Sequence, residues 1–376
     1  MDDAPDPAGL VADYRPGDFL LAGPSGTVRA AGAAAVVADP DPDELAGRVA
    51  KLLADTGAPL AAGALPFRPD AAPHVVIPDT AVRAGRVRSG RAGRSGLVPV
   101  ARRPVPAGAA YAEAVATAVR TLRDGSGLRK VVLARALDLD FAAPIDVPAL
   151  LPGLVAANPN GYTFAVGLPG ATLLGATPEL LLSRRGRVVA ANPLAGTRPR
   201  SADPGLDRAA AAGLLASAKD RAEHRVVVDA VAEALRPFCA ALTVPAEPEL
   251  VETPTVWHLS TAITGTVADP EVSSLRLASA LHPTPAVCGT PTDSALSVIG
   301  GLEPFDRGFY SGAVGWCDAA GDGEWVVAIR CAEAAGARMR LFAGAGIMPA
   351  SDPAAELAET TAKFATLLGA FGIDPE

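Results

Sequence analysis

Residues 257–363 contain, in close succession, the segments WHLSTAITG (257–265), LHPTPAVCGTP (281–291), GLEPFDRGFYSGAVGWCD (301–318), GEWVVAIRCA (323–332), LFAGAGIMPASDP (341–353) and ELAETTAK (356–363). Charged and polar side chains stand here among glycines, prolines and apolar runs that are typical of buried segments. A buried charge costs several kcal/mol unless it is paired, hydrogen-bonded or bound to a metal. We therefore expect a function for five residues of this stretch, namely His258, Arg330, Glu356, Glu359 and Lys363.

Beyond this stretch, the composition sets broad limits. The chain has 376 residues, of which 49% are hydrophobic, enough for one large body or for two or three ordinary domains. It has no run of roughly eighteen uncharged apolar residues, so we expect no membrane span. Its first residues, MDDAPDPAGL, lack the basic and apolar regions of a signal peptide. We therefore expect a cytoplasmic protein.

The cysteines and the net charge narrow the class further. Cys239, Cys288, Cys317 and Cys331 are widely spaced and form no C-x-x-C pair. This spacing favours reduced core thiols over a disulfide framework or a zinc site. A net charge of −8 at pH 7 argues against a nucleic-acid-binding surface. It permits an anionic substrate, because one arginine-lined pocket can lie in an acidic protein.

Periodic patterns of apolar residues predict both strands and helices. Strands are predicted at 19–23, 73–80 and 129–141, as several short segments within 162–198, around 250–267, and at 312–317, 324–333 and 338–345. Helices are predicted at 41–57, 110–125, 207–238, 271–281 and 352–370, and the third of these has room for one break. The proline-rich residues 282–292 are expected to form a loop. Strands in runs, with helices grouped between them, favour an α+β fold.

A basic segment, RAGRVRSGRAGRSG (83–96), lies within a loop that we predict at 82–103. It can be interpreted as a phosphate- or RNA-binding tract or as a solvated linker. It has no interleaved aromatic residues and belongs to an acidic protein, so we favour the linker.

Taken together, the motifs of residues 257–363 resemble those of the chorismate-utilising enzymes, and among these the isochorismate synthases. Anthranilate synthase component I and the salicylate synthases are relatives in the same family. The resemblance implies two antiparallel β-sheets packed face to face, with helices on the outside and a site between the sheets. It covers residues 104–376, which we expect to form the chorismate-binding catalytic region. Residues 1–103, a strand and helix portion with the basic linker, are expected to belong to the same body.

Three carboxylates are candidates for a metal site. Glu356, Glu359 and Lys363 lie at i, i+3 and i+7, on one face of the last predicted helix. Taken alone, this spacing also fits an exposed helix with a Glu–Lys pair, and Glu223 of KDRAEH (219–224) also fits an exposed ion pair. The resemblance implies instead that Glu223 and Glu359, together with Glu356, bind Mg²⁺, a hard cation that prefers oxygen ligands.

The resemblance also implies a set of substrate-binding residues. Arg330 lies in the strand predicted at 324–333, where it either reaches solvent from a sheet edge or binds a carboxylate of chorismate. Tyr310 is a second contact, Lys363 neutralises a carboxylate, and Gly344 lets the backbone approach the substrate closely. The remaining candidates are Gly196, Thr197, His258 and Ala286. On its own, His258 also fits a core histidine.

An acid and a base complete the expected site. Lys130, in the strand predicted at 129–141, is by itself typical of a sheet edge or the surface. The segment RKVVLAR (129–135) resembles the family's base-bearing strand, which implies that Lys130 activates the attacking water. Glu179 is the implied acid, and its apolar neighbours should raise its pKa. The implied reaction is attack of water at C2 of chorismate while Glu179 protonates the departing C4 hydroxyl, which gives isochorismate.

Three positions bear on the choice among related activities. Ala195 stands where one class of aminodeoxychorismate synthase has a nucleophilic lysine, so amination by that route is not expected. Ala286 stands where salicylate synthases usually have threonine, which favours release of isochorismate. Tyr310, in contrast, is typical of the salicylate-forming relatives. The alternative is therefore a salicylate synthase, while a non-catalytic protein that binds an aromatic dicarboxylate is disfavoured by the intact acid and base.

The expected partner is the small molecule chorismate, with Mg²⁺ as the cofactor and no nucleic acid or membrane. We expect no glutaminase subunit, because Lys130 favours water over ammonia as the nucleophile. We also expect a monomer. The product would serve siderophore, menaquinone or other secondary metabolism, and the sequence does not choose among these pathways.

Overall fold

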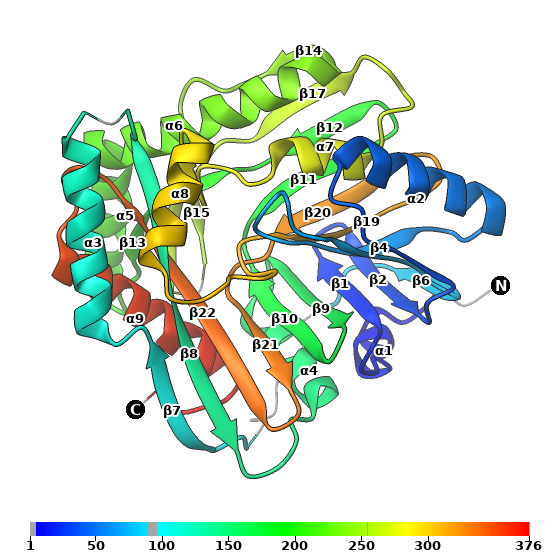
Figure 1. Ribbon diagram of the computed structural model, residues 1–376, viewed down its shortest axis with the longest axis horizontal. Coiled ribbons are helices and arrows are strands. Elements are labelled where there is room, and N and C mark those ends of the chain that lie inside the picture. Colours follow the sequence, from blue (N-terminus) through cyan, green and yellow to red (C-terminus); the bar gives the residue numbers. More distant parts are fainter. Residues whose placement is uncertain (1–4, 89–95, 126, 254, 376) are drawn as a thin grey trace.

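The computed structural model describes residues 5–88, 96–125, 127–253 and 255–375. Two large sheets dominate this part of the chain, and a smaller sheet lies beside them (Figure 1). The strand pairings in these ranges are all antiparallel. The predicted α+β fold with antiparallel sheets is confirmed.

The first sheet has the strand order β18-β8-β22-β21-β10-β9-β1-β2-β6, and β7 also pairs with β8. Its strands are β1 (Phe19–Gly23), β2 (Gly26–Ala31), β6 (Thr80–Ala84), β7 (Pro99–Val105), β8 (Lys130–Phe141), β9 (Tyr162–Leu168), β10 (Ala171–Thr177), β18 (Gly289–Thr290), β21 (Cys331–Ala335) and β22 (Arg338–Ile347). β8 and β22 are the longest of these strands and pair along almost their whole length.

The second sheet has the order β14-β17-β12-β11-β20-β19-β4-β5-β3. Its strands are β3 (Ala35–Val37), β4 (Ala61–Leu65), β5 (His74–Ile77), β11 (Leu180–Arg185), β12 (Val188–Ala191), β14 (Cys239–Thr243), β17 (Ile263–Val267), β19 (Ala313–Cys317) and β20 (Gly323–Val327). The small sheet consists of β13 (Leu194–Pro199), β16 (Val256–Ser260) and β15 (Glu249–Glu252).

Helices pack against all three sheets. They are α1 (Pro7–Ala12), α2 (Pro42–Thr56), α3 (Gly108–Arg123), α4 (Val147–Ala157), α5 (Pro204–Ala216), α6 (Ala218–Leu235), α7 (Ser274–Leu281), α8 (Thr292–Leu302) and α9 (Pro353–Ala370). Apolar side chains of α1, α4 and α9 pack on the first sheet, and those of α2, α6 and α7 pack on the second. None of the described helices is both long enough and apolar enough to span a bilayer.

The two large sheets pack face to face around a shared core. Phe164 and Leu21 contribute to it from the first sheet, and Val314 and Val326 contribute from the second. Strands from the first hundred residues take part in both sheets, since β1 pairs with β9 and β4 pairs with β19. Burial of these large apolar side chains on both inner faces is the main force that joins the sheets.

The long helix predicted at 207–238 is interrupted once, as expected. α5 ends at Ala216 and α6 begins at Ala218. Ser217 between them has extended backbone angles, and its side chain accepts a hydrogen bond from the Asp220 amide as the N-cap of α6.

The linker predicted at 82–103 is wrong at both ends, because β6 continues to Ala84, and β7 begins at Pro99 and pairs with β8. The sequence PVARRPV hides this strand, since proline lacks the amide hydrogen that a central strand needs. β7 tolerates both prolines because it pairs with β8 alone. Residues 89–95 of the basic segment lie outside the described residues.

The structure also contains elements that the sequence patterns did not predict. The helix α4 escaped prediction because Pro152 lies inside it and reads as a helix breaker. The helix α8 is short and contains two glycines, and it follows the predicted proline-rich loop. The two-residue strand β18 lies within that loop, and β14 is an unpredicted edge strand of the second sheet.

The strand predicted at 324–333 is two strands in different sheets. β20 belongs to the second sheet and β21 to the first, so the chain crosses between the sheets over residues 328–330. The prediction that Arg330 lies in a strand is therefore wrong. Arg330 lies at the crossing between the sheets. Its φ of 50° is in the left-handed region, which a non-glycine residue rarely adopts.

Candidate active site

A cavity of about 110 Å³ brings together residues from many separate parts of the chain. The sequence-predicted residues that line it are Lys130, Glu179, Gly196, Thr197, Glu223, His258, Ala286, Tyr310, Arg330, Gly344, Glu359 and Lys363. Glu356 is the one predicted residue outside this lining. Ala195 also lines the cavity, and its methyl group offers no nucleophilic amine at this position.

Lys130 is the first residue of β8, and its side chain is almost completely buried. It does not lie at an open edge, because β22 pairs with one side of β8 and Thr290 of β18 pairs with Lys130 on the other. Its Nζ lies 2.9 Å from Oε1 of Glu223 on α6. The reading of Lys130 as a surface lysine is therefore wrong.

Gly346 on β22 allows this ion pair to form in a narrow space. A Cβ at this position would lie 2.7 Å from Glu223 Oε1 and 3.1 Å from Lys130 Cε, so a side chain here would force the ion pair to shift. Sequence reasoning selected Gly344 and missed Gly346. The alternation of the two glycines in AGAGI was the available signal, because strand residues two apart face the same side.

Glu179 lies in the turn between β10 and β11, where the chain passes from the first sheet to the second. Its side chain is 4% exposed. Burial raises the pKa of Glu179 to about 8, although the charge of Lys130 acts in the opposite direction. The predicted rise is therefore present, and at neutral pH this carboxyl group holds a proton that it can donate.

Arg330 offers a cation to the cavity. Within the described residues, no ion pair or hydrogen bond occupies its guanidinium group, although its backbone oxygen accepts a hydrogen bond from the Ala176 amide. Burial lowers the pKa of Arg330, and the charge of Glu359 opposes this effect. A half-buried arginine without a bound partner is well suited to a carboxylate ligand, which it can hold with two parallel hydrogen bonds.

Ser311 is a second residue with a left-handed backbone, at φ 62°, and it also lines the cavity. Its amide donates a hydrogen bond to the oxygen of Ala328, which lies in the crossing that contains Arg330. Strained non-glycine residues cluster at functional sites. Sequence reasoning missed Ser311, because backbone strain leaves no mark on a sequence.

Tyr310, next to Ser311, forms part of the cavity through its ring. The ring stacks on Phe342 with centroids 4.8 Å apart and an interplanar angle of 7°. Burial raises the pKa of Tyr310 to about 12, so the phenol stays protonated. A Cβ on Gly344 would lie 2.9 Å from the Tyr310 hydroxyl oxygen, so the glycine at 344 makes room for this group.

The small sheet contributes Gly196, Thr197 and His258. Gly196, at φ 73°, is the extra residue where the pairing of β13 with β16 shifts register. The Nδ1 atom of His258 lies 3.0 Å from Thr197 Oγ1 and 3.4 Å from the Gly196 oxygen. Burial and the charges of Arg330 and Lys363 lower the pKa of His258 to about 3, so its imidazole is neutral.

His258 Nε2 is buried and has no hydrogen-bond partner among the described residues. Because the Gly196 oxygen can only accept, its contact with Nδ1 assigns the ring proton to Nδ1. Nε2 is then an acceptor at the cavity, available to a hydroxyl group of a ligand. This unsatisfied atom favours a ligand contact over a satisfied core histidine.

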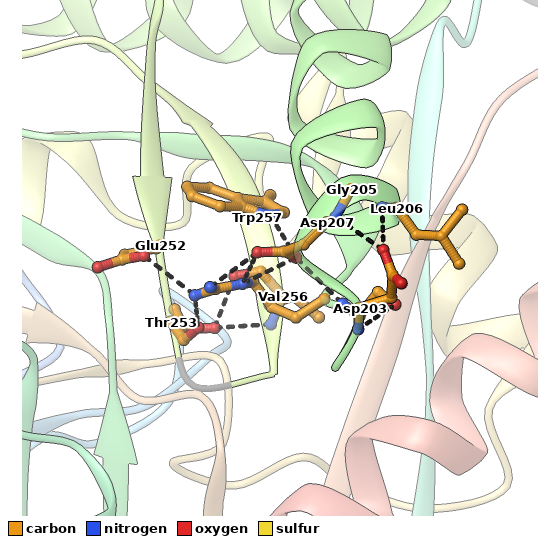
Figure 2. A network of polar contacts seen from close by, with 10 residues as sticks. Asp203, Gly205, Leu206, Asp207, Glu252, Thr253, Val256 and Trp257 are labelled. Atoms are coloured by element: carbon orange, nitrogen blue, oxygen red, sulfur yellow. Dashed lines mark hydrogen bonds and ion pairs between the residues drawn. The ribbon is translucent and has the colours of Figure 1, made fainter.

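A polar network next to His258 joins the small sheet to α5 (Figure 2). Asp207 of α5 accepts a hydrogen bond of 3.0 Å from Trp257 Nε1 and pairs with Arg200 at 2.9 Å. Arg200 also donates to Glu252 of β15, and its guanidinium carbon lies 4.5 Å from the centroid of the Trp257 ring. The network joins α5 to β15 and β16 directly beside His258.

The carboxylates expected to hold a metal lie near one another. Burial raises the pKa of Glu356, and repulsion from Glu359 and Glu223 adds to the rise. Burial alone would also raise the pKa of Glu359, but Lys363 and Arg330 hold it below its usual value. In the part of the chain described, no group of three or more His, Cys, Asp or Glu side chains is placed so that it could hold a metal ion.

These donors fit a hard divalent cation that keeps water or substrate oxygens as its other ligands. Glu223 and Glu359 both line the cavity, and each is paired with a lysine, Glu223 with Lys130 and Glu359 with Lys363 at 2.7 Å. Carboxylate oxygens without thiolate or imidazole ligands suit Mg²⁺. Lys363 also donates to the Gly344 oxygen, which fixes its ammonium group at the edge of the cavity.

Comparison with known proteins agrees with this geometry. A family model described as chorismate binding enzyme matches residues 91–372. The chain belongs to the chorismate binding enzymes. The family membership predicted from the motifs is therefore confirmed.

Individual members of the chorismate binding enzymes are similar over nearly the whole chain. Isochorismate synthase DhbC of Bacillus subtilis is 47% identical over 387 aligned positions, covering 97% of this chain and 96% of that protein. The crystal structure of a putative 2,3-dihydroxybenzoate-specific isochorismate synthase, DhbC from Bacillus anthracis, matches with a TM-score of 0.93 and 42% identity, covering 98% and 100% of the two chains. MenF, the menaquinone-specific isochorismate synthase of Escherichia coli, matches with a TM-score of 0.86 and 25% identity, covering 99% and 92%.

Proposed function

We propose that this chorismate binding enzyme is a magnesium-dependent isochorismate synthase. The observation that carries the proposal is one cavity that holds a buried lysine, a protonated glutamic acid and an unpaired arginine. Each of the three groups matches one need of the reaction, namely a base for water, an acid for the departing hydroxyl and a cation for a carboxylate. The similarity to proteins named isochorismate synthases supports the same substrate.

The proposed binding mode uses the cations of the cavity for the two carboxylates of chorismate. Arg330 binds one of them, since its guanidinium has no partner among the described residues and lines the cavity at the crossing between the sheets. Lys363 reduces the negative charge at the other. The acceptor His258 Nε2 receives a hydrogen bond from the ring hydroxyl, and Tyr310 with Gly344 borders the substrate.

In the proposed reaction, water adds to C2 and hydroxide leaves C4 while the ring double bonds shift. The oxygen of water forms a bond to C2, and Lys130 accepts the proton that this oxygen loses. The C4–O bond breaks, and Glu179 donates its proton to the leaving oxygen, so one water is used and one is released. A raised pKa suits Glu179 to this role, because an ionised carboxylate has no proton to give.

Glu223 and Glu359, with Glu356 beside them, are the residues that would hold Mg²⁺. When bound there, the cation would neutralise the ring carboxylate and draw electron density from the ring. The protein side chains would still supply the proton transfers. We also propose a cytoplasmic monomer that works without a glutaminase subunit.

Incubation with chorismate and Mg²⁺, followed by chromatographic separation of the products, tests the proposal. Isochorismate as the sole product, lost when a chelator removes the metal, would support it. Salicylate together with pyruvate would favour the alternative, a salicylate synthase, for which Tyr310 is the supporting residue. Unchanged chorismate, with and without metal, would contradict both.

A further inference from the structure

Behind the cavity lies a buried ion pair that none of the proposed catalytic or binding steps uses. Glu303 follows the end of α8, and Arg307 lies four residues later in the segment that leads to Tyr310. Their side chains are 3% and 1% exposed, and neither residue lines the cavity. Arg307 Nε lies 2.8 Å from Glu303 Oε2, and Nη2 lies 2.5 Å from Oε1, so the contact is bidentate.

The Glu303–Arg307 pair also binds the backbone of two segments that do line the cavity. Arg307 Nη1 donates to the oxygen of Val287 at 2.8 Å, and Nη2 donates to the oxygen of Val132 on β8 at 2.8 Å. Glu303 Oε1 accepts a 2.7 Å hydrogen bond from the Ala134 amide on β8. One guanidinium group therefore bridges the strand of Lys130 and the loop that contains Ala286.

Arg307 also contacts two aromatic rings. The guanidinium carbon of Arg307 lies 4.2 Å from the ring centroid of Phe67 and 5.9 Å from that of Tyr310. The Tyr310 amide donates to the Arg307 backbone oxygen at 2.9 Å. Three sides of the cavity, at Val132, Ala286–Val287 and Tyr310, are thus in contact with the one residue Arg307.

We propose that Arg307, held by Glu303, is a positioning residue that sets the separation between β8 and the Ala286–Val287 loop and thereby the fit of the substrate. The inference rests on the proposed function, because it takes chorismate as the ligand. β8 is already fixed by its long pairing with β22, so the loop and Tyr310 are the parts that Arg307 controls. Loss of this control should weaken substrate binding more than it slows the chemical step.

The test must separate positioning from stability, since removing one partner leaves a buried charge without compensation. The double variant Glu303→Gln/Arg307→Met removes both charges and both hydrogen bonds to the carbonyl oxygens, and it keeps an acceptor for the Ala134 amide. Arg307→Lys keeps the charge, but a single ammonium group cannot reproduce the planar fork. For both variants, KM and kcat for chorismate, the melting temperature, and the dissociation constant by calorimetry are measured.

We expect the KM and the dissociation constant of both variants to rise about tenfold while kcat stays within about threefold of the wild type. The matched control is Asp138→Asn/Arg340→Met, which removes a bidentate pair that joins β8 to β22 near their other ends. Its KM should not change. An unchanged KM in Arg307→Lys and in the double variant would overturn the proposal. A rise of KM that matches the fall of the melting temperature equally in these variants and in the control would overturn it too.

Chorismate binding and conversion by the wild type distinguish a failure of this proposal from a failure of the proposed function. Chorismate that binds but is not converted to isochorismate would contradict the function, while the dissociation constants of the variants would still decide the role of Arg307. Absence of chorismate binding by the wild type would overturn both.

Discussion

Glu179 and Arg330 occupy neighbouring crossings between the two large sheets. The Val327 amide donates to the Glu179 backbone oxygen at 3.1 Å, and the Ala176 amide donates to the Arg330 oxygen at 3.0 Å. β10 pairs with β21 in the first sheet, and β11 pairs with β20 in the second, so the two connections run side by side. The fold thereby places an acid and a cation together at the cavity.

Replacing Glu179 should abolish most of the activity and remove the decline of kcat/KM at alkaline pH. Glu179→Gln keeps the size of the side chain but has no proton to donate, so we expect kcat to fall by about 10²–10⁴-fold. In the wild type, kcat/KM should decline as pH rises through about 8, where Glu179 ionises. Steady-state kinetics across this range, with circular dichroism as the folding control, checks both. A wild-type profile that is flat through pH 9 would contradict the assignment of Glu179.

The same pKa predicts the sign of a stability change. The folded protein holds the Glu179 proton up to about pH 8, whereas the unfolded chain releases it near 4.5. Between these values the folded state binds more protons, so the contribution of Glu179 to the free energy of unfolding falls as pH rises. Glu179→Gln should therefore show a smaller decrease of the melting temperature across this window than the wild type. Equal decreases would mean that Glu179 ionises normally.

Two replacements of Arg330 should weaken substrate binding equally and differ in stability. Both Arg330→Ala and Arg330→Gly remove the guanidinium group, so we expect KM for chorismate to rise by about 10- to 100-fold. Glycine accepts the left-handed backbone without strain, so Arg330→Gly should be more stable than Arg330→Ala by about 1 kcal/mol. Denaturant unfolding and kinetics of the two variants measure this difference. If the alanine variant is the more stable, the backbone at residue 330 is not strained.

Lys130 should be required for turnover and not for binding. Lys130→Met removes the amine and preserves much of the buried volume, and we expect kcat to fall by about 10²–10⁴-fold. Lys51→Met, on the exposed side of α2, is the matched control and should not change kcat. Calorimetry should detect chorismate binding in both variants. A kcat of Lys130→Met within about threefold of the wild type would exclude Lys130 as the base.

Magnesium should bind the protein directly and stabilise it. A ligand at about 100 times its dissociation constant stabilises the folded state by about 2.7 kcal/mol, so Mg²⁺ should raise the melting temperature. The double variant Glu223→Gln/Glu359→Gln should lose this rise, and Glu44→Gln, on the exposed side of α2, should retain it. A rise that persists in the double variant would place the cation elsewhere.

The sequence predicted the fold class and most of the cavity because each part of the site stands in a short motif that can be recognised locally, although the motifs are far apart in the chain. Lys130, Glu223 and Glu359 stand in short motifs that resemble those of the chorismate-utilising enzymes, and this resemblance, not the residue types alone, implied a base and metal ligands. What it missed depends on long-range geometry. The crossing at Arg330 looks like the middle of one strand, since nothing in WVVAIRCA marks the change of sheet.

Other omissions have a similar physical origin. Arg307 was passed over because an arginine four residues after a glutamate also fits an exposed ion pair, and only burial reveals its hydrogen bonds to two distant segments. β7 was interpreted as part of a linker because its prolines are acceptable only at a sheet edge. Edge position and burial are properties of the assembled sheets.

Turnover of chorismate in water enriched with heavy oxygen tests the proposed chemistry most directly. The account predicts isochorismate that carries one heavy oxygen from the solvent, located at C2, because water supplies that oxygen and the original C4 hydroxyl leaves. Mass spectrometry of the product and of its fragments locates the label. Isochorismate without solvent oxygen at C2 would contradict the account.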